Sequence, residues 1–140
     1  MREIAEVMIG IWMFVIATVD WRTKRIPVWM IGILGGACLL CRILWIPNSW
    51  HGTLGGVTVG FACLLLGRLT EESIGYGDGL VILFLGVVFG FGKVLIMVVS
   101  GAAMAWVFHF TLDLCRGRVK NRSIAFIPFL CFGYGVALLW

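Results

Sequence analysis

Six long apolar runs, separated by short polar gaps, make up most of the sequence. They extend roughly from Ile4 to Val19, Val28 to Ile46, Thr53 to Leu69, Gly79 to Gly92, Val94 to Leu112 and Ile124 to Trp140. A membrane-spanning helix needs about 20 mostly apolar residues, so six helices would use about 120 of the 140 residues. Only 13% of the residues are charged and 61% are hydrophobic, which leaves too little charge to cover a soluble domain of this size. The sequence therefore predicts an all-α polytopic membrane protein with about six transmembrane helices.

The fourth run, from Gly79 to Gly92, is the shortest of the six. At a rise of 1.5 Å per residue it would cover about 21 Å, less than a hydrocarbon core of about 30 Å. We expect this segment to be tilted or partly re-entrant, or the bilayer to thin beside it. Glycine-interrupted backbone is tolerated at membrane depth where it lines a protein cavity.

The basic residues gather in alternate gaps between the runs. Eight of the 11 Lys and Arg residues lie in the first, third and fifth gaps, namely Arg22, Lys24, Arg25, Arg68, Arg116, Arg118, Lys120 and Arg122. Gaps rich in Lys and Arg stay in the cytoplasm, which predicts that both chain termini face out. Arg2 and Lys93 lie on the other side, and Arg42 falls within the second run, where its side chain can reach the interface. Because these charges are spread over short gaps, no nucleic-acid partner is expected.

Glycine is abundant, with 19 residues, and several glycines are spaced four apart within the apolar runs. Such spacing lets two helix backbones approach closely in a membrane, where apolar burial gives no drive to associate. Three pairs are therefore expected to be packing contacts: Gly32 with Gly36, Gly56 with Gly60, and Gly86 with Gly90.

Two of the seven acidic residues stand apart from the others. Five are expected to be solvated charges at the membrane interface: Glu3, Glu6, Glu71, Glu72 and Asp113. Asp20 ends the first apolar run and Asp78 directly precedes the fourth, so both are predicted at the cytoplasmic ends of spans. They are far apart in the sequence, and only helix packing can bring them together.

A pair of carboxylates at one membrane depth is suited to hydrolysis of a peptide bond. Two carboxylates close together in a low-dielectric site cannot easily both ionise, so the pair would share one proton at neutral pH. One carboxylate would then activate a water molecule, and the other would hydrogen-bond the carbonyl oxygen under attack. No metal, cofactor or covalent intermediate is required. The alternative is that each Asp caps a helix, which suits Asp78 better than Asp20, because Asp20 faces an unfavourable helix dipole.

Three motifs resemble those of one known family. The run from Asp20 to Pro27 combines an Asp, a basic stretch and an Ile-Pro pair; Gly75-Tyr76-Gly77-Asp78 is a Gly-x-Gly-Asp string; and the run from Ile124 to Leu130 contains Ile-Pro-Phe after a basic gap. In this order they resemble the motifs of type IV prepilin peptidases, and the chain is similar to the short, stand-alone form found in tight-adherence (Flp-type) pilus systems.

The resemblance implies an intramembrane aspartic endopeptidase of the cell inner (plasma) membrane, acting at the cytoplasmic face. Its substrate would be a type IV prepilin or prepilin-like protein (pseudopilin), from which it removes the basic leader, and membrane lipids would be its other partners. Asp20 and Asp78 would be catalytic, and Gly75 and Gly77 would shape the second motif and leave room for an extended substrate. A basic leader also favours nearby acids, for which the candidates are Glu71 and Glu72.

The sequence departs from the family pattern at several positions. Val28 stands where many members have Asn, and Gly79 and Leu80 stand where many have a Val-Lys pair, so a basic side chain beside the second Asp is missing. The larger members also carry a zinc-binding methyltransferase domain, which is not expected here. Cys38 and Cys41 form a Cys-x-x-Cys string, but it lies inside an apolar run without a second pair. We therefore expect a single membrane peptidase domain over residues 1–140.

Three alternatives share some of these features: a presenilin-like protease, a proton-coupled carrier and a non-catalytic membrane component. Presenilin-like proteases share the Gly-x-Gly-Asp string but need a Tyr-Asp pair and a Pro-Ala-Leu motif, whereas Val19 precedes Asp20 and Pro-Ala-Leu does not occur. A proton-coupled carrier, or a non-catalytic membrane component, would also use paired intramembrane acids. Carriers typically show repeat symmetry and a site at the bilayer midplane, and the sequence shows neither.

Overall fold

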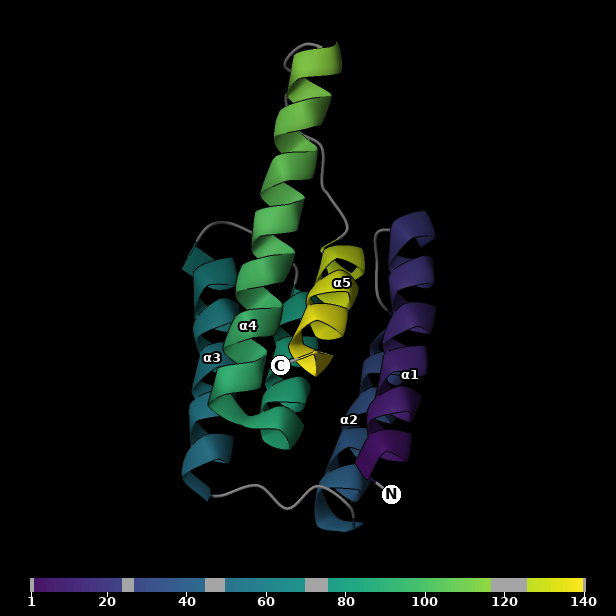
Figure 1. Ribbon diagram of the computed structural model, residues 1–140, viewed down its shortest axis with the longest axis vertical. Coiled ribbons are helices and arrows are strands. Elements are labelled where there is room, and N and C mark those ends of the chain that lie inside the picture. The colour runs from purple at the N-terminus through teal and green to yellow at the C-terminus, as the bar shows by residue number, and fades with distance from the viewer. Residues whose placement is uncertain (1, 24–26, 45–49, 70–75, 117–125, 140) are drawn as a thin grey trace.

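All the secondary structure described is helical. The computed structural model describes residues 2–23, 27–44, 50–69, 76–116 and 126–139. It contains five helices: α1 (Arg2–Thr23), α2 (Val28–Leu44), α3 (Trp50–Leu69), α4 (Tyr76–Arg116) and α5 (Ile127–Leu138) (Figure 1). Two stretches are long and apolar enough to cross a membrane, Glu3–Thr23 in α1 and Tyr76–Leu112 in α4. The all-helical prediction is confirmed, and the number of spans stays a prediction.

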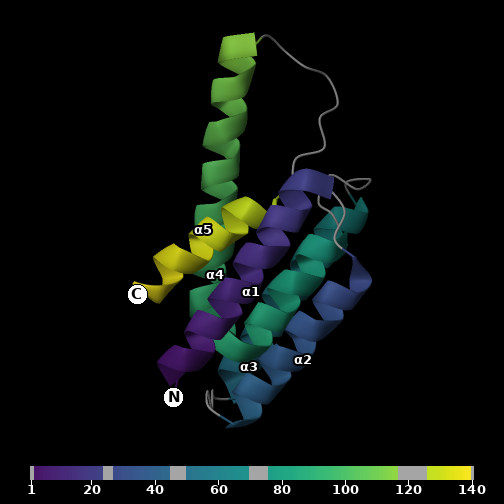
Figure 2. The ribbon, with the colours of Figure 1, turned by 90° about the vertical axis from the view of Figure 1, so that its right-hand side faces the viewer.

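The longest helix, α4, is interrupted at Gly90. This residue has φ 76° and ψ −178°, a conformation that is almost restricted to glycine. The chain reverses its direction here, so the two halves of α4 run back along the bundle side by side (Figures 1 and 2). The fourth and fifth predicted runs therefore appear as the two halves of one element, and the turn lies at Gly90 rather than at Lys93.

The halves of α4 form the centre of the bundle. Helices α2, α3 and α5 pack against α4, and α1 packs against α2 and α5 (Figure 2). No Cα atom of α1 lies within 8 Å of a Cα atom of α4. The buried core residues come from α1, α2, α4 and α5, while α3 adds the partly buried Val59 and Cys63 and several glycine contacts.

Glycines allow α3 to approach α4 at backbone distance. A Cβ atom added to Gly56 would overlap the backbone of Gly86, and one added to Gly60 would overlap the backbone of Leu83. The second half of α4 and α5 approach in the same way, because a Cβ atom at Gly133 would overlap the carbonyl oxygen of Met97. These contacts confirm the predicted packing role of Gly56, Gly60 and Gly86.

The predicted packing role of Gly32 and Gly36 is wrong. A Cβ atom added to either residue would meet nothing within 4 Å, and both are exposed. Gly35 lies against α4 instead, where a Cβ atom would be 2.6 Å from the ring of Phe84. The rotation of α2 about its axis explains the difference, since Leu34 and its neighbours on that side of α2 face the core.

Two cations, Arg42 and Lys93, lie around the reversal at Gly90. Arg42 Nη1 donates a 3.0 Å hydrogen bond to the carbonyl oxygen of Val87, one of the last carbonyls before the break. Lys93 Nζ lies 3.8 Å from Glu6 Oε1 and 5.9 Å from the centre of the Phe89 ring. Positive charge is favourable at a helix C-terminus, which accounts for Arg42, whereas Lys93 follows the break and is paired with Glu6. Glu6 is half-buried and paired, so its prediction as a solvated charge is wrong.

Candidate active site

Asp20 is the last member of the buried stripe of α1. Residues spaced three or four apart along this helix face the core: Ala5, Ile9, Met13, Ile16 and Asp20. The next three residues, Trp21 to Thr23, are exposed. Asp20 is only 5% exposed, so the helical period that buries the apolar residues also buries this carboxylate.

The first turn of α5 lies against the Asp20 carboxylate. The backbone N–H of Ile127 donates to that carboxylate, and Ile127 is the first residue of α5. The first N–H groups of a helix lack partners within the helix and favour a negative charge. The other carboxylate oxygen, Oδ2, is buried and has no hydrogen-bond partner among the described residues. One oxygen of Asp20 is thus anchored, and the other is available to a water molecule or substrate.

Sequence reasoning missed the contribution of Ile127. The group involved is a backbone N–H, which has no signature of its own among residue types. A signal was nevertheless present, because Pro128 follows Ile127 and proline is favoured in the first turn of a helix. The Ile-Pro-Phe motif therefore marks the start of α5, where the N–H of Ile127 has no partner within the helix and can bind Asp20.

Asp78 lies in the first turn of α4 and is 7% exposed. The helix begins at Tyr76, so Asp78 is inside the first turn and is not the N-cap residue that the capping alternative requires. The next residue, Gly79, faces α3, where a Cβ atom would lie 2.6 Å from the side chain of Leu64. Close packing of α3 on this turn helps to bury Asp78.

Asp20 and Asp78 are the buried charged residues of the described part of the chain. The end of α1 and the start of α4 lie toward the same end of the bundle (Figure 2). The Cα atoms of the two residues are more than 8 Å apart, so any meeting between them is made by the side chains. The structure places both acids in the interior at one end of the molecule, and the shared proton stays a prediction.

The other predicted site residues have different outcomes. Gly77 is the second residue of α4 and is half-buried. The chain is already helical at Gly77, and Gly90 is the described glycine with positive φ, so the role of Gly77 in shaping the motif stays a prediction. Gly75, Glu71 and Glu72 lie outside the described residues.

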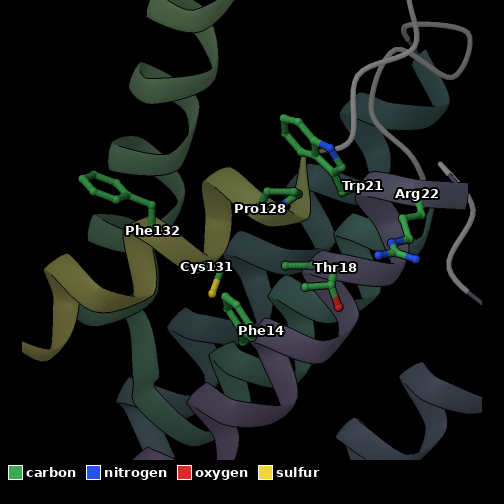
Figure 3. Close-up of a pocket in the computed structure, with 8 residues that line it drawn as sticks. Phe14, Thr18, Trp21, Arg22, Pro128, Cys131 and Phe132 are labelled. Atoms are coloured by element: carbon green, nitrogen blue, oxygen red, sulfur yellow. The ribbon is translucent and has the colours of Figure 1, made fainter.

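A groove of about 480 Å³ runs between α1 and α5 (Figure 3). Its walls are mostly apolar and aromatic, and the residues that line it are Phe14, Ala17, Thr18, Trp21, Arg22, Pro128, Cys131 and Phe132. We call this feature the α1–α5 groove.

An aromatic cluster fixes the end of α1 at this place. The ring centroids of Trp21 and Phe108 are 6.4 Å apart, and those of Phe108 and Phe129 are 5.4 Å apart. These distances lie within the range of favourable aromatic contact. The cluster links α1, the second half of α4 and the first turn of α5 around the site.

The described part of the chain is all-helical, with two stretches long and apolar enough to cross a membrane and two buried acids. Residues 7–110 match the type IV leader peptidase family, and this range contains Asp20 and Asp78. The chain belongs to this family of peptidases, as its motifs predicted. Searches of curated proteins and of solved structures found no match.

Proposed function

We propose that the protein is an intramembrane aspartic endopeptidase that removes the basic leader of type IV prepilins or prepilin-like proteins. It would act in the cell inner (plasma) membrane, at the cytoplasmic face. The observation that carries the proposal is the burial of Asp20 and Asp78 at one end of a helical bundle in a member of a peptidase family. Buried acids of this kind are costly in a membrane protein and mark functional sites.

The chemistry assigns one proton to the pair of carboxylates. The ionised carboxylate takes a proton from a water molecule, which attacks the carbonyl carbon of the scissile peptide bond. The protonated carboxyl donates a hydrogen bond to the carbonyl oxygen and stabilises the charge that develops on it. The C–N bond then breaks, and a proton from the pair passes to the leaving amine. This scheme requires no cofactor.

Each of the surrounding groups has a role in this scheme. The N–H of Ile127 anchors one oxygen of Asp20, which leaves Oδ2 as the position for water or substrate. Gly75 and Gly77 shape the chain before Asp78, and Glu71 and Glu72 attract the basic leader. Residues 1–140 act as one membrane peptidase domain. Family membership favours this proposal over a proton-coupled carrier or a non-catalytic component.

Leader removal in membranes tests the proposal. A prepilin-like substrate is incubated with the wild type, Asp20→Asn and Asp78→Asn, because Asn keeps the shape of Asp but cannot exchange a proton. Each change should abolish cleavage at unchanged protein level. Glu3→Gln is the matched control, since Glu3 is an exposed acid on the same helix as Asp20 and should retain full activity. Undiminished cleavage by either Asn variant would rule out the aspartic mechanism.

A further inference from the structure

Both helices contribute residues to the α1–α5 groove that flank the candidate catalytic Asp20 or its hydrogen-bond partner. On α1, Ala17 and Trp21 line the groove, and they lie one turn before Asp20 and directly after it. On α5, Pro128 lines the groove and follows Ile127, whose N–H holds Asp20. A molecule that fills the groove therefore lies against the residues that flank Asp20.

The chemistry of the lining selects an apolar occupant. Phe14, Trp21 and Phe132 are each more than half exposed in this groove, so their rings are free to contact a ligand (Figure 3). The hydroxyl of Thr18 already donates a 2.8 Å hydrogen bond to the carbonyl oxygen of Val15, so its proton is not free to bind a ligand. Arg22 supplies the charge of the lining, and it lies next to the last residue of α1.

The dimensions and direction of the groove fit a helix lying along α1. From Phe14 to Arg22 the groove follows about two helical turns, or about 12 Å. This part of α1 belongs to the stretch Glu3–Thr23 that is able to cross a membrane, so the occupant lies within the bilayer. An apolar helix gains affinity from aromatic anchors spaced along such a groove.

We propose that the α1–α5 groove holds the first two turns of the substrate's apolar helix during cleavage. The inference rests on the proposed function. A lipid tail shares the apolar chemistry, but a polypeptide is the occupant that also delivers a peptide bond to the residues that flank Asp20. The bond to be cut lies at the border between a basic leader and an apolar segment. Seating that segment in the groove places the border beside Asp20 and leaves the leader outside.

Cys131 makes this arrangement directly measurable, because it lines the groove and is a free thiol. The enzyme variant for this test retains Cys131 as its sole cysteine. It also carries Asp78→Asn, which stops turnover. The probe is a model substrate with a Lys-rich leader, a glycine and a 20-residue apolar helix, with one cysteine moved through the first eight helix positions. Disulfide crosslinks should form with a helical period of three to four residues. An enzyme whose sole cysteine is Cys63, on α3, is the control and should give no such period.

Narrowing the groove provides a kinetic test. Thr18→Trp should raise KM for the model substrate by about tenfold and leave kcat unchanged, because it blocks docking and not chemistry. Ile11→Trp adds the same bulk to an exposed position of α1 outside the groove and should leave both constants unchanged. A substrate truncated after two residues of its apolar segment should be cut equally well by the wild type and by Thr18→Trp.

Three outcomes separate the proposal from its alternatives. Cleavage by the wild type without periodic crosslinks at Cys131, and with an unchanged KM for Thr18→Trp, overturns the groove assignment and leaves the proposed function standing. Phospholipid that co-purifies with the wild type but not with Thr18→Trp, with KM unchanged, assigns the groove to lipid and also overturns it. Failure of the wild type to cleave any prepilin-like substrate removes the proposed function and this inference together.

Discussion

The hydroxyl of Tyr134 donates a 2.6 Å hydrogen bond to the backbone carbonyl oxygen of Glu6, across 128 positions of sequence. The bond ties the second half of α5 to the first turns of α1. The ring of Tyr134 also meets Phe89 edge to face, with centroids 5.6 Å apart, just before the break in α4. Three elements are therefore fixed together at the end of the bundle away from the aspartates, and this sets how α5 presents Ile127 to Asp20.

Removing the hydroxyl of Tyr134 should destabilise the helical bundle without leaving a cavity in the core. Tyr134→Phe keeps the ring and loses one buried hydrogen bond, so the free energy of unfolding should fall by about 1 kcal/mol. Equilibrium unfolding in mixed micelles measures the change. Tyr76→Phe is the control, because Tyr76 is exposed and its hydroxyl should contribute little. Equal stability of the two variants would show that the bond to Glu6 does not hold α5 in place.

The reversal at Gly90 should not tolerate a side chain. Its φ of 76° with ψ of −178° is nearly restricted to glycine, so Gly90→Ala should destabilise the protein by roughly 1–3 kcal/mol. Gly92→Ala is the matched control, since a Cβ atom there meets nothing within 4 Å and alanine favours a helix. Thermal unfolding of the purified variants should rank Gly90→Ala below the wild type and Gly92→Ala at or above it. The opposite order would contradict a turn at Gly90.

Contact between α3 and α4 should depend on Gly56. A Cβ atom at this position overlaps the backbone of Gly86, so Gly56→Ala should separate the two helices and cost roughly 1–3 kcal/mol of stability. The reference variant is Gly36→Ala, whose Cβ atom would lie in open space and should change stability by less than about 0.5 kcal/mol. Protein yield and unfolding midpoint both report the difference. A tolerated alanine at Gly56 would disprove the close approach.

Recognition of the leader should depend on the charges of Glu71 and Glu72. Reversing both to Lys should raise KM by roughly 2- to 30-fold, since ion pairs in water contribute about 0.2–1 kcal/mol each. Turnover at saturating substrate should not change, because neither residue takes part in the chemistry. Glu3→Lys on α1 controls for the added positive charge. For a substrate whose leader lysines are replaced by alanine, the double variant and the wild type should have the same KM. A different KM would show that these acids do not bind the basic leader.

Much of the helical architecture was predictable because it depends on local pattern. Apolar runs define helices in a membrane protein, and the stripe from Ala5 to Ile16 has the period of a helix with one buried face. That same period places Asp20 on the buried face. The family was also predictable, since three short motifs occurred in the family's order and the family match confirmed it.

What could not be predicted depends on how the helices are turned toward one another. Gly32, Gly35 and Gly36 are equivalent on the printed sequence, and only the rotation of α2 selects Gly35 for contact with Phe84. The turn in α4 lies in a stretch with several glycines, and Gly90 is selected by the contacts around it. The N–H of Ile127 is a backbone group, so residue types alone do not reveal that it serves Asp20.

The unequal halves of α4 determine how deep the acids lie. The two halves of α4 meet at Gly90. At 1.5 Å per residue, Asp78 lies about 18 Å from Gly90 along the first half, and Leu112 lies about 33 Å from Gly90 along the second half. The apolar surface of the second half thus extends about 15 Å past the level of Asp78. Where that surface is embedded in lipid, the carboxylate of Asp78 lies below the level at which the second half of α4 ends. Hydrolysis by this protein should therefore accelerate in lipids with short tails and slow in lipids with long ones.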